Sequence, residues 1–154
     1  ISRSVREKGC VFCNAVNKPD PESLICCRGE KYYVIMNRYP YNSGHLMIVP
    51  YRHEDSPEKI PAAEATEMWD LMNRSMDILR RSFNPAGFNL GMNIGKAAGA
   101  GVKDHFHLHI VPRWEGDANF MPVIGHTEVA SYSMDTIFEI LHKEINKRKE
   151  ETET

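Results

Sequence analysis

The 154-residue chain lacks several features that mark specialised classes of protein. No run approaches the roughly 18 consecutive apolar residues of a membrane-spanning helix, and no secretory signal opens the chain. The formal net charge is −2, and there is no basic stripe of the kind that binds duplex nucleic acid. These absences predict a soluble, cytoplasmic protein whose partners include neither a membrane nor a nucleic acid polymer.

Cysteine is scarce, and its four copies do not suit a disulfide framework. Cys26 and Cys27 are adjacent and would bridge poorly, and a chain of this length folds without disulfide staples. Cys10 and Cys13 have the C-x-x-C spacing of a metal knuckle or a redox pair. Because no β-α-β pattern follows them, we favour a metal site, which needs two further ligands.

Hydrophobic residues make up 42% of the chain, enough for one compact domain with an ordinary core. We therefore expect a single domain over residues 1–154, with a disordered charged tail at 150–154. Apolar alternation and turn residues predict strands, and apolar stripes with a spacing of three or four predict helices. The expected strands are 24–27, 31–36, 45–50, 88–94 and 105–111, and the expected helices are 61–83 and 134–149.

Three histidines alternate with apolar residues in the stretch 105–111. In a strand, His105, His107 and His109 would share one face at intervals of roughly 6 to 7 Å, and Pro112 would end the strand. Such a row can hold a metal with further ligands from elsewhere. Alternatively, one neutral imidazole can attack an electrophile while its neighbours orient the substrate. A solvated polar strand face is the least favoured interpretation.

Two loops beside predicted strands carry candidate ligand contacts. Residues 37–44 combine turn-forming and aromatic residues, and they lead to His45, a fourth candidate active-site imidazole. Residues 95–101 are small, and glycine allows a phosphate to approach the backbone closely. This loop matches neither the Walker nor the Rossmann spacing, so its position directly before the histidines gives it most of its weight.

Together these blocks resemble the histidine triad (HIT) superfamily. The resemblance rests on His105-Phe106-His107-Leu108-His109-Ile110-Val111 and on Gly44-His45 before an apolar strand that ends at Pro50, and it covers about residues 10–120. In addition, Asn37 to His45 and Pro112 to Phe120 are similar to the bacterial diadenosine tetraphosphate phosphorylases of that superfamily.

The resemblance implies an α+β, HIT-like fold: a five-stranded antiparallel sheet with one long helix and a C-terminal helix, usually in a homodimer. It also implies a nucleotidyl transferase or hydrolase that cleaves dinucleoside polyphosphates. His107 would attack the α-phosphorus and form a nucleotidyl-histidine intermediate. In the phosphorylase branch, inorganic phosphate resolves this intermediate, so that diadenosine tetraphosphate yields ADP and ATP. In the hydrolase branches, water does so and releases AMP.

Further site residues follow from the resemblance and from the position of the two loops. The catalytic set is His107 with His45, His105 and His109. The expected nucleotide contacts are Asn37 to the ribose, Ile35 beside the base, Asn93, Gly99 and Gly101 at the phosphates, and Trp114 and Asn119 in the downstream block. The substrates would be adenosine polyphosphates and inorganic phosphate, with no organic cofactor.

Some members of the superfamily hold a structural zinc ion, and the resemblance extends to its ligands. Cys10, Cys13, His53 and His105 occupy the matching positions and offer two thiolates and two imidazoles, which suit tetrahedral zinc. The competing interpretation of His53 is an exposed loop histidine beside Arg52 and Glu54. The presence of all four ligands together favours zinc.

Position 101 departs from the family pattern. Related hydrolases often carry serine or threonine where this chain has Gly101, so a hydroxyl that would help a leaving group is missing, which favours polyphosphate over phosphoramidate substrates. Three alternatives stay open at this point. They are a hydrolase of asymmetric nucleotide polyphosphates or phosphoramidates, a nucleotide-binding signalling module, and a metal-dependent enzyme that uses the triad as ligands.

Overall fold

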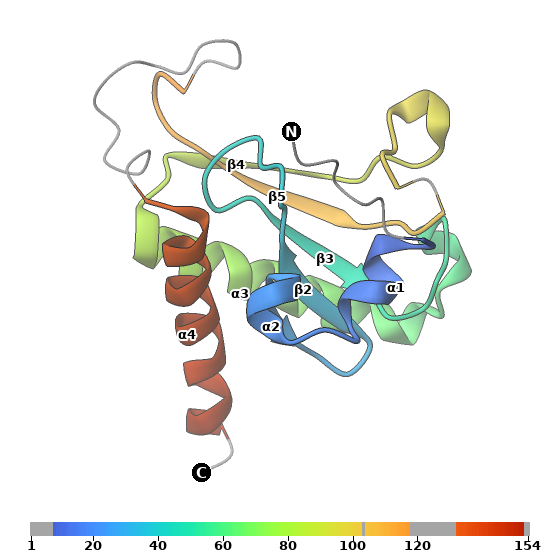
Figure 1. The fold of residues 1–154 in the computed structure, drawn as a ribbon, viewed down its shortest axis with the longest axis horizontal. Coiled ribbons are helices and arrows are strands. Elements are labelled where there is room, and N and C mark those ends of the chain that lie inside the picture. Colours follow the sequence, from blue (N-terminus) through green and yellow to red (C-terminus); the bar gives the residue numbers. More distant parts are fainter. Residues whose placement is uncertain (1–7, 103, 118–131, 153–154) are drawn as a thin grey trace.

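A five-stranded antiparallel sheet in the order β1-β2-β3-β5-β4 forms the centre of the molecule (Figure 1). The structure, a computed structural model, describes residues 8–102, 104–117 and 132–152. The strands are β1 (Ile25–Arg28), β2 (Tyr32–Met36), β3 (Leu46–Pro50), β4 (Gly87–Gly91) and β5 (Leu108–Arg113). The predicted α+β fold with a five-stranded antiparallel sheet is confirmed.

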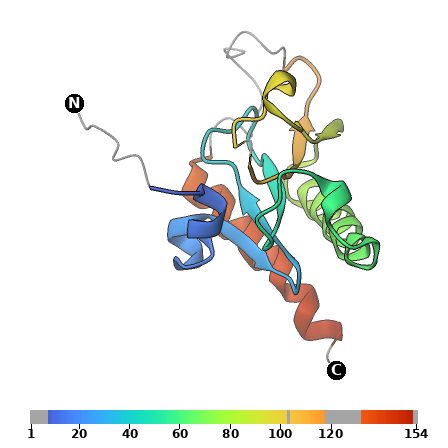
Figure 2. The same cartoon turned by 90° about the vertical axis from the view of Figure 1, so that its right-hand side faces the viewer.

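Two helices of 19 residues each, α3 (Ala65–Phe83) and α4 (Met134–Thr152), pack beside one another and bury apolar side chains against the sheet. The short helices α1 (Val11–Ala15) and α2 (Asp20–Ser23) precede the first strand, and Figure 2 shows them on the other side of the sheet from α3. The 3₁₀ turns are η1 (Pro57–Lys59), η2 (Ala62–Glu64) and η3 (Lys96–Ala98). Among the described residues, no helix has the length and apolar character needed to cross a membrane.

The register of the sheet decides which side chains face the site. Ile35, Met47 and His109 lie opposite one another across β2, β3 and β5. Directly paired residues point to the same face, so these three side chains share the face away from α3. Their neighbours Ile48 and Ile110 point the other way and are fully buried in the core.

The triad segment differs from the expected strand. The strand begins at Leu108, so His105 and His107 precede it, and the prediction of one continuous strand through all three histidines is wrong. The pairing of β3 with β5 ends at the Ile48–Leu108 pair. Pro50, close beyond this pair, has no N–H to continue a ladder, and its carbonyl instead accepts a hydrogen bond from the imidazole of His105.

Pro112 does not end β5, which continues to Arg113. The residue is tolerated because β3 pairs with β5 only as far as Ile110, so at Pro112 the strand has β4 as its only neighbour in the sheet, with Phe88 opposite.

Other boundaries also differ from the expected ones, most of them by a single residue. Helix α3 begins at Ala65 rather than at 61, because Pro61 leads into the 3₁₀ turn η2. Strand β4 ends at Gly91 rather than at 94. Helix α4 extends to Thr152, beyond the expected end at 149, and the disordered tail stays a prediction.

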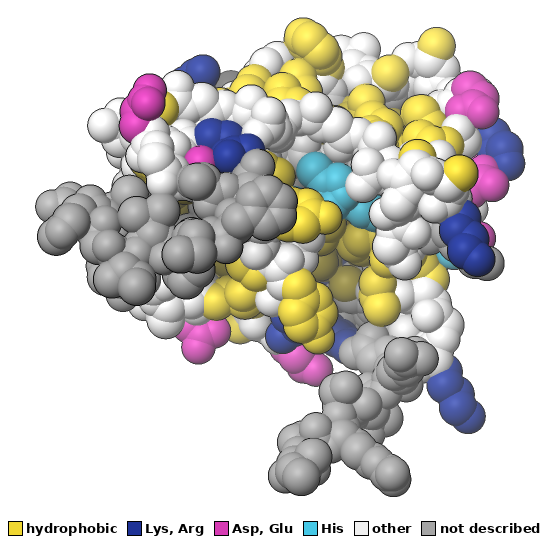
Figure 3. All heavy atoms as spheres, turned by 90° about the horizontal axis from the view of Figure 1, so that it is seen from above, with side chains coloured by type: hydrophobic (Ala, Val, Ile, Leu, Met, Phe, Trp, Pro, Cys, Tyr) yellow, Lys and Arg dark blue, Asp and Glu magenta, His cyan; other side chains and the backbone are white. Residues whose placement is uncertain are grey.

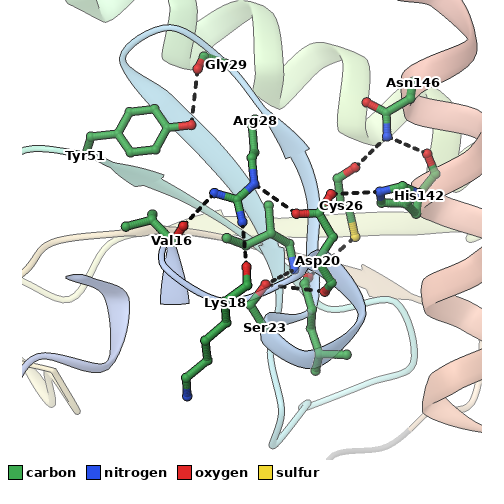
Figure 4. Close-up of polar contacts among 12 residues, drawn as sticks. Val16, Lys18, Asp20, Ser23, Cys26, Arg28, Gly29, Tyr51, His142 and Asn146 are labelled. Carbon is green, nitrogen blue, oxygen red and sulfur yellow. Dashed lines mark hydrogen bonds and ion pairs between the residues drawn. The ribbon is translucent and has the colours of Figure 1, made fainter. Parts of the chain in front are cut away.

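A polar network joins α2, β1 and α4 (Figure 4). The carboxylate of Asp20 accepts hydrogen bonds from Arg28 Nε at 2.8 Å and from His142 Nε2 at 3.0 Å. Burial alone would raise the pKa of Asp20, but these two partners hold it below its ordinary value. Asn146 of α4 donates to the carbonyl of Cys26 in β1 at 2.9 Å. The network fixes the C-terminal helix to the sheet.

Candidate functional site: a histidine cluster beside a Cys2His2 cluster

His107, the predicted nucleophile, lies immediately before β5, and its imidazole is oriented by its own chain. Nδ1 is 3.1 Å from the carbonyl oxygen of His105, and a carbonyl can only accept, so Nδ1 carries the proton and Nε2 carries a lone pair. The ring of Phe12 packs against the imidazole with ring centroids 4.8 Å apart. Burial lowers the pKa of His107, although the bond to His105 acts against it. The neutral, nucleophilic form is therefore favoured.

His45 and His109 form a second unit with a defined direction of hydrogen bonding. The backbone N–H of Tyr41 donates to His45 Nδ1 at 3.2 Å, which leaves the proton of neutral His45 on Nε2. That Nε2 lies 2.8 Å from His109 Nδ1, so His109 accepts there and keeps its own proton on Nε2. The chain of donors thus runs from Tyr41 through His45 to His109 and ends in an N–H group.

Both imidazoles of this unit stay neutral near pH 7. Burial, with His109 and His107 nearby, lowers the pKa of His45 from its ordinary 6.5 to about 4. Burial and the nearby His107 lower the pKa of His109 to about 4 as well. The rings of His107 and His109 meet edge to face with centroids 4.7 Å apart, so the two units adjoin. Histidine side chains reach the surface on the face seen in Figure 3, with hydrophobic side chains around them.

The turn before His45 requires glycine. Gly44 has φ +80°, and a Cβ atom there would lie 3.0 Å from Leu79 Cδ2 and 3.4 Å from Pro112 Cγ. A larger residue would therefore meet both backbone strain and a buried side chain of α3. This close approach lets the turn pack on the core while His45, 1% exposed, points to His109.

The four predicted metal ligands converge on one point. The ligand atoms of Cys10, Cys13, His53 and His105 all lie within 4.8 Å of one another. Cys13 Sγ lies 3.3 Å from His53 Nδ1 and 3.6 Å from His105 Nδ1, and Cys10 Sγ lies 3.4 Å from His105 Nδ1. A tetrahedral zinc ion with ordinary bond lengths would separate sulfur and nitrogen ligands by about 3.6 Å. All four cysteines of the chain are free thiols, so the donor set and the spacing both fit zinc.

His105 connects this cluster to the nucleophile. Its Nε2 donates to the carbonyl of Pro50 at 2.7 Å, which leaves the lone pair on Nδ1, the atom that faces Cys10 and Cys13. Its own carbonyl accepts from His107. Burial, and the Cys10 thiol beside it, raise the pKa of the Cys13 thiol, so a bound cation is what would favour thiolates there.

The structure brings two of the predicted nucleotide contacts to the histidine face. Ile35 is buried in β2, in the cross-strand row with Met47 and His109. Asn37 follows β2, and its Nδ2 lies 3.7 Å from Met47 Sδ. Both therefore lie on the same side of the sheet as the histidines, as the expected base and ribose contacts require.

The loop after β4 is arranged differently from the expectation. The amide of Gly99 already donates to Lys96 O at 3.1 Å within η3, so a phosphate contact at this position would require the turn to open. Asn93 is half-buried and Gly101 is exposed, and within the described residues no hydrogen bond joins either to the histidines. Their contacts with phosphate stay predictions.

The downstream block lies further from the chemistry. Trp114 is five residues beyond His109, roughly 16 Å along the strand, and its indole N–H donates to the carbonyl of Phe83 at 3.2 Å. This bond gives Trp114 a structural role, and its nucleotide contact stays a prediction. Asn119 lies outside the described residues.

The sequence did not reveal the roles of Phe12, Tyr41 and Asn42. Phe12 lies between the two cysteines, where its apolar character signalled only that the C-x-x-C turn is partly buried. The contribution of Tyr41 is a main-chain N–H, which no side-chain pattern reveals. Asn42 is a turn residue before Ser43 and Gly44, and this signal indicated the turn but not its partners across the fold.

The comparison with known families decides the affiliation of this histidine cluster. A family model described as the HIT domain matches residues 18–116. The chain belongs to the HIT domain family. The resemblance stated from the motifs is thereby confirmed, and the matched residues include His45, His105, His107 and His109.

Named relatives and a solved structure agree with this family assignment. A Mycobacterium tuberculosis protein named AP-4-A phosphorylase is 42% identical over 110 residues, 71% of this chain and 56% of that protein, so the chain spans little more than half the relative's length. A bis(5'-adenosyl)-triphosphatase of Dictyostelium discoideum is 30% identical over 96 residues, 62% of this chain and 64% of that protein. A Zn-bound histidine triad family protein of Mycobacterium smegmatis superposes with a TM-score of 0.71 at 23% identity over 93% of this chain and 97% of that one, which shows the shared fold.

Proposed function

We propose that the chain is an enzyme that cleaves dinucleoside polyphosphates, and that it converts diadenosine tetraphosphate and inorganic phosphate into ADP and ATP. The observation that carries the proposal is the pair of opposed imidazole states: an unprotonated Nε2 on His107 beside an N–H on His109. One group is prepared to attack phosphorus and the other to stabilise the oxygens around it. The name of the M. tuberculosis relative supports this choice of substrate.

In the first step, Nε2 of neutral His107 attacks the α-phosphorus. The new P–N bond replaces the P–O bond to the leaving polyphosphate, which departs as ATP. The imidazole gains positive charge as it bonds to phosphorus, and its Nδ1–H already donates to the carbonyl of His105, which stabilises this charge. The Nε2–H of His109 donates to a phosphoryl or leaving-group oxygen, whose negative charge increases in the transition state.

In the second step, an oxygen of inorganic phosphate attacks the nucleotidyl-histidine. The P–N bond breaks, His107 returns to its neutral form, and the new P–O bond gives ADP. Imidazole suits both steps because it is nucleophilic when neutral and is a good leaving group when it carries positive charge. With water in place of phosphate, the product would be AMP.

Product analysis with and without inorganic phosphate tests the proposal. ADP and ATP that form only with phosphate are the expected products, whereas AMP and ATP regardless of phosphate would identify a hydrolase. His107→Asn should abolish turnover while metal content and folding are retained. His142→Gln changes a histidine of α4 in the polar network with α2 and β1. It serves as the matched control and should keep full turnover. Activity that survives in His107→Asn would refute the covalent route.

A hydrolase of the same fold is the second candidate, because the D. discoideum relative is named as a triphosphatase. A nucleotide-binding signalling module is the third. It predicts nucleotide binding without turnover, and the intact histidine cluster counts against it. A metal enzyme that uses all three triad histidines as ligands is disfavoured. Only His105 of the triad belongs to the Cys2His2 cluster, whereas His109 is hydrogen-bonded to His45.

We further propose that Cys10, Cys13, His53 and His105 hold a structural zinc ion. The fit of the donor set supports this, as does the zinc named in the M. smegmatis structure. When bound, the ion supplies a fixed, closed coordination shell and takes no part in the chemistry. It would pin α1, and with it Phe12, to the segment that carries the nucleophile.

The homodimer also stays a proposal, and β4 is the surface that supports it. This strand lies at the edge of the sheet and is unpaired on its outer side within the described residues. Leu90 on it is 43% exposed, and such an edge can pair with a second copy. Sedimentation of the protein and of Leu90→Lys tests it: a dimer that the lysine weakens is expected.

We also propose a cytoplasmic location, which is consistent with the four free thiols.

A further inference from the structure

Asn42, in the loop between β2 and β3, connects this loop to the far end of β5. Its side-chain amide donates one hydrogen bond to the carbonyl of Pro112 at 2.9 Å and one to Asp117 Oδ2 at 2.7 Å. Both protons of the amide are therefore used by partners 70 and 75 residues away in the sequence. A turn residue that served only the turn would not need such partners.

Asp117 is itself held firmly. Arg113 donates to both of its carboxylate oxygens at 2.9 Å, and the backbone N–H of Trp114 donates at 3.0 Å. A bidentate pair of guanidinium and carboxylate has a fixed geometry as well as a favourable energy. The Asp117 side chain is only 16% exposed, so solvent screens this pair less than it would an ordinary surface pair. Asn42 is thus attached to a rigid point.

Asn42 also lies within the turn that orients His45. Its own carbonyl accepts the backbone N–H of His45 at 3.1 Å, and the residue before it, Tyr41, donates its N–H to His45 Nδ1. Pro112, its other partner, follows His109 by three residues along β5. Asn42 therefore fixes the loop that orients His45 to the strand that carries His109.

We propose that Asn42 and Asp117 are positioning residues that hold His45 and His109 in a single tautomeric arrangement, with the donor N–H of His109 directed at the substrate. The inference extends the proposed function, on which it rests for the role of that N–H. Neither residue contacts the reacting atoms. They act by keeping the Tyr41 N–H in line with His45 Nδ1.

The tautomer matters because a neutral imidazole can carry its proton on either nitrogen. If the Tyr41 N–H moves away, His45 can place its proton on Nδ1 and accept at Nε2. His109 would then donate from Nδ1 and present a lone pair, which repels phosphate oxygens, at Nε2. Among residues 8–102, 104–117 and 132–152, the groups that face these two imidazoles are His107 and the ring of Tyr41, stacked 5.1 Å from His45, and none of them is a carboxylate. The direction of the relay therefore depends on the Tyr41 N–H.

Nitrogen-15 NMR of the histidine side chains tests this in the 154-residue chain without substrate. The wild type should show His45 and His109 both protonated at Nε2 near pH 7. In Asn42→Ala, a mixture of tautomers is expected at both, and their titration midpoints should rise by about one pH unit, because an N–H donor opposite a lone pair disfavours protonation. Asp117→Asn keeps the side-chain shape but loses the charge and should show a smaller change of the same sign.

Kinetics complete the test. In Asn42→Ala, kcat should fall about tenfold with KM changed less than about threefold, and the acidic limb of the kcat profile should move to higher pH. Asp77→Asn, which removes an exposed ion pair on α3, is the control and should match the wild type. Wild-type tautomers and an unshifted acidic limb in Asn42→Ala would overturn the inference. Because the NMR readout needs no turnover, a failure of the proposed substrate would be recognised separately.

Discussion

Replacement of Gly44 by alanine tests how closely the turn before His45 is packed on the core. Gly44 has φ +80°, a region that costs an alanine roughly 1–2 kcal/mol. The added Cβ would also lie 3.0 Å from Cδ2 of Leu79, a fully buried side chain that would have to shift to make room. Allowing for the reduced entropy of the unfolded chain, we expect a net loss of about 2–3 kcal/mol.

Gly95 provides a matched control. Its φ of +81° is nearly the same, but a Cβ there would have nothing within 4 Å. Gly95→Ala should therefore cost only about 0.5–1 kcal/mol, the backbone part of the effect. At about 2–4 °C per kcal/mol for a chain of this size, Gly44→Ala should lower the Tm by about 4–12 °C and Gly95→Ala by a few degrees at most.

Urea unfolding and calorimetry of the two variants measure the difference. A third protein, Gly44→Ala with Leu79→Ala, should be more stable than the sum of the two single changes predicts, by about 1 kcal/mol, because the second change removes the contact. Equal losses at Gly44 and Gly95, or strict additivity in the double variant, would refute the view that the contact with Leu79 limits this position.

Three further predictions concern metal, charge and pH. Cys13→Ser should abolish stoichiometric zinc in elemental analysis, and chelation of the wild type should cost on the order of 3 kcal/mol of stability; zinc content unaffected by the substitution would exclude the proposed ligand set. Asp20→Asn should lower the free energy of unfolding by about 1–2 kcal/mol at pH 7. Because folding lowers the pKa of Asp20, the difference in stability between this variant and the wild type should disappear as the pH falls below 3.8. A difference that does not depend on pH would contradict this. Folding lowers the pKa values of His45 and His109 from 6.5 to about 4, so the unfolded chain binds more protons between these two pH values. The free energy of unfolding should therefore decrease from pH 6.5 towards pH 4, by on the order of 2 kcal/mol per histidine at pH 5. A free energy of unfolding in urea that stays constant over that range would rule out buried neutral imidazoles.

The elements of the fold followed from local patterns. The apolar stripe that ends at Phe83 and the alternation in 31–36 each correspond to an observed element, because period and burial are local properties of the chain. The start of β5 could not be read in this way. The alternation of histidines extends back to 105, but the partner strand reaches Pro50 and cannot continue the ladder, and this limit lies more than fifty residues away.

The candidate site was predictable to a similar extent. The C-x-x-C spacing alone indicated Cys10 and Cys13, and the resemblance to the family added His53 and His105; the structure places all four together. The bond directions within the cluster of His45, His107 and His109 were not predictable, because they depend on main-chain atoms of Tyr41 and His105 that every residue possesses. Likewise, the pairing of Asn42 with Asp117 depends on the tertiary fold alone.

The donor that orients His45 is a main-chain group, and this has a consequence for how the site tolerates change. A substitution at position 41 alters the ring that stacks on His45, but it leaves the N–H in place for every residue except proline. The side chain at position 41 can therefore vary without removing the donor that sets the proton arrangement of His45 and His109. The orientation of His45 thus depends on the path of the backbone through residue 41, and not on which side chain that residue carries.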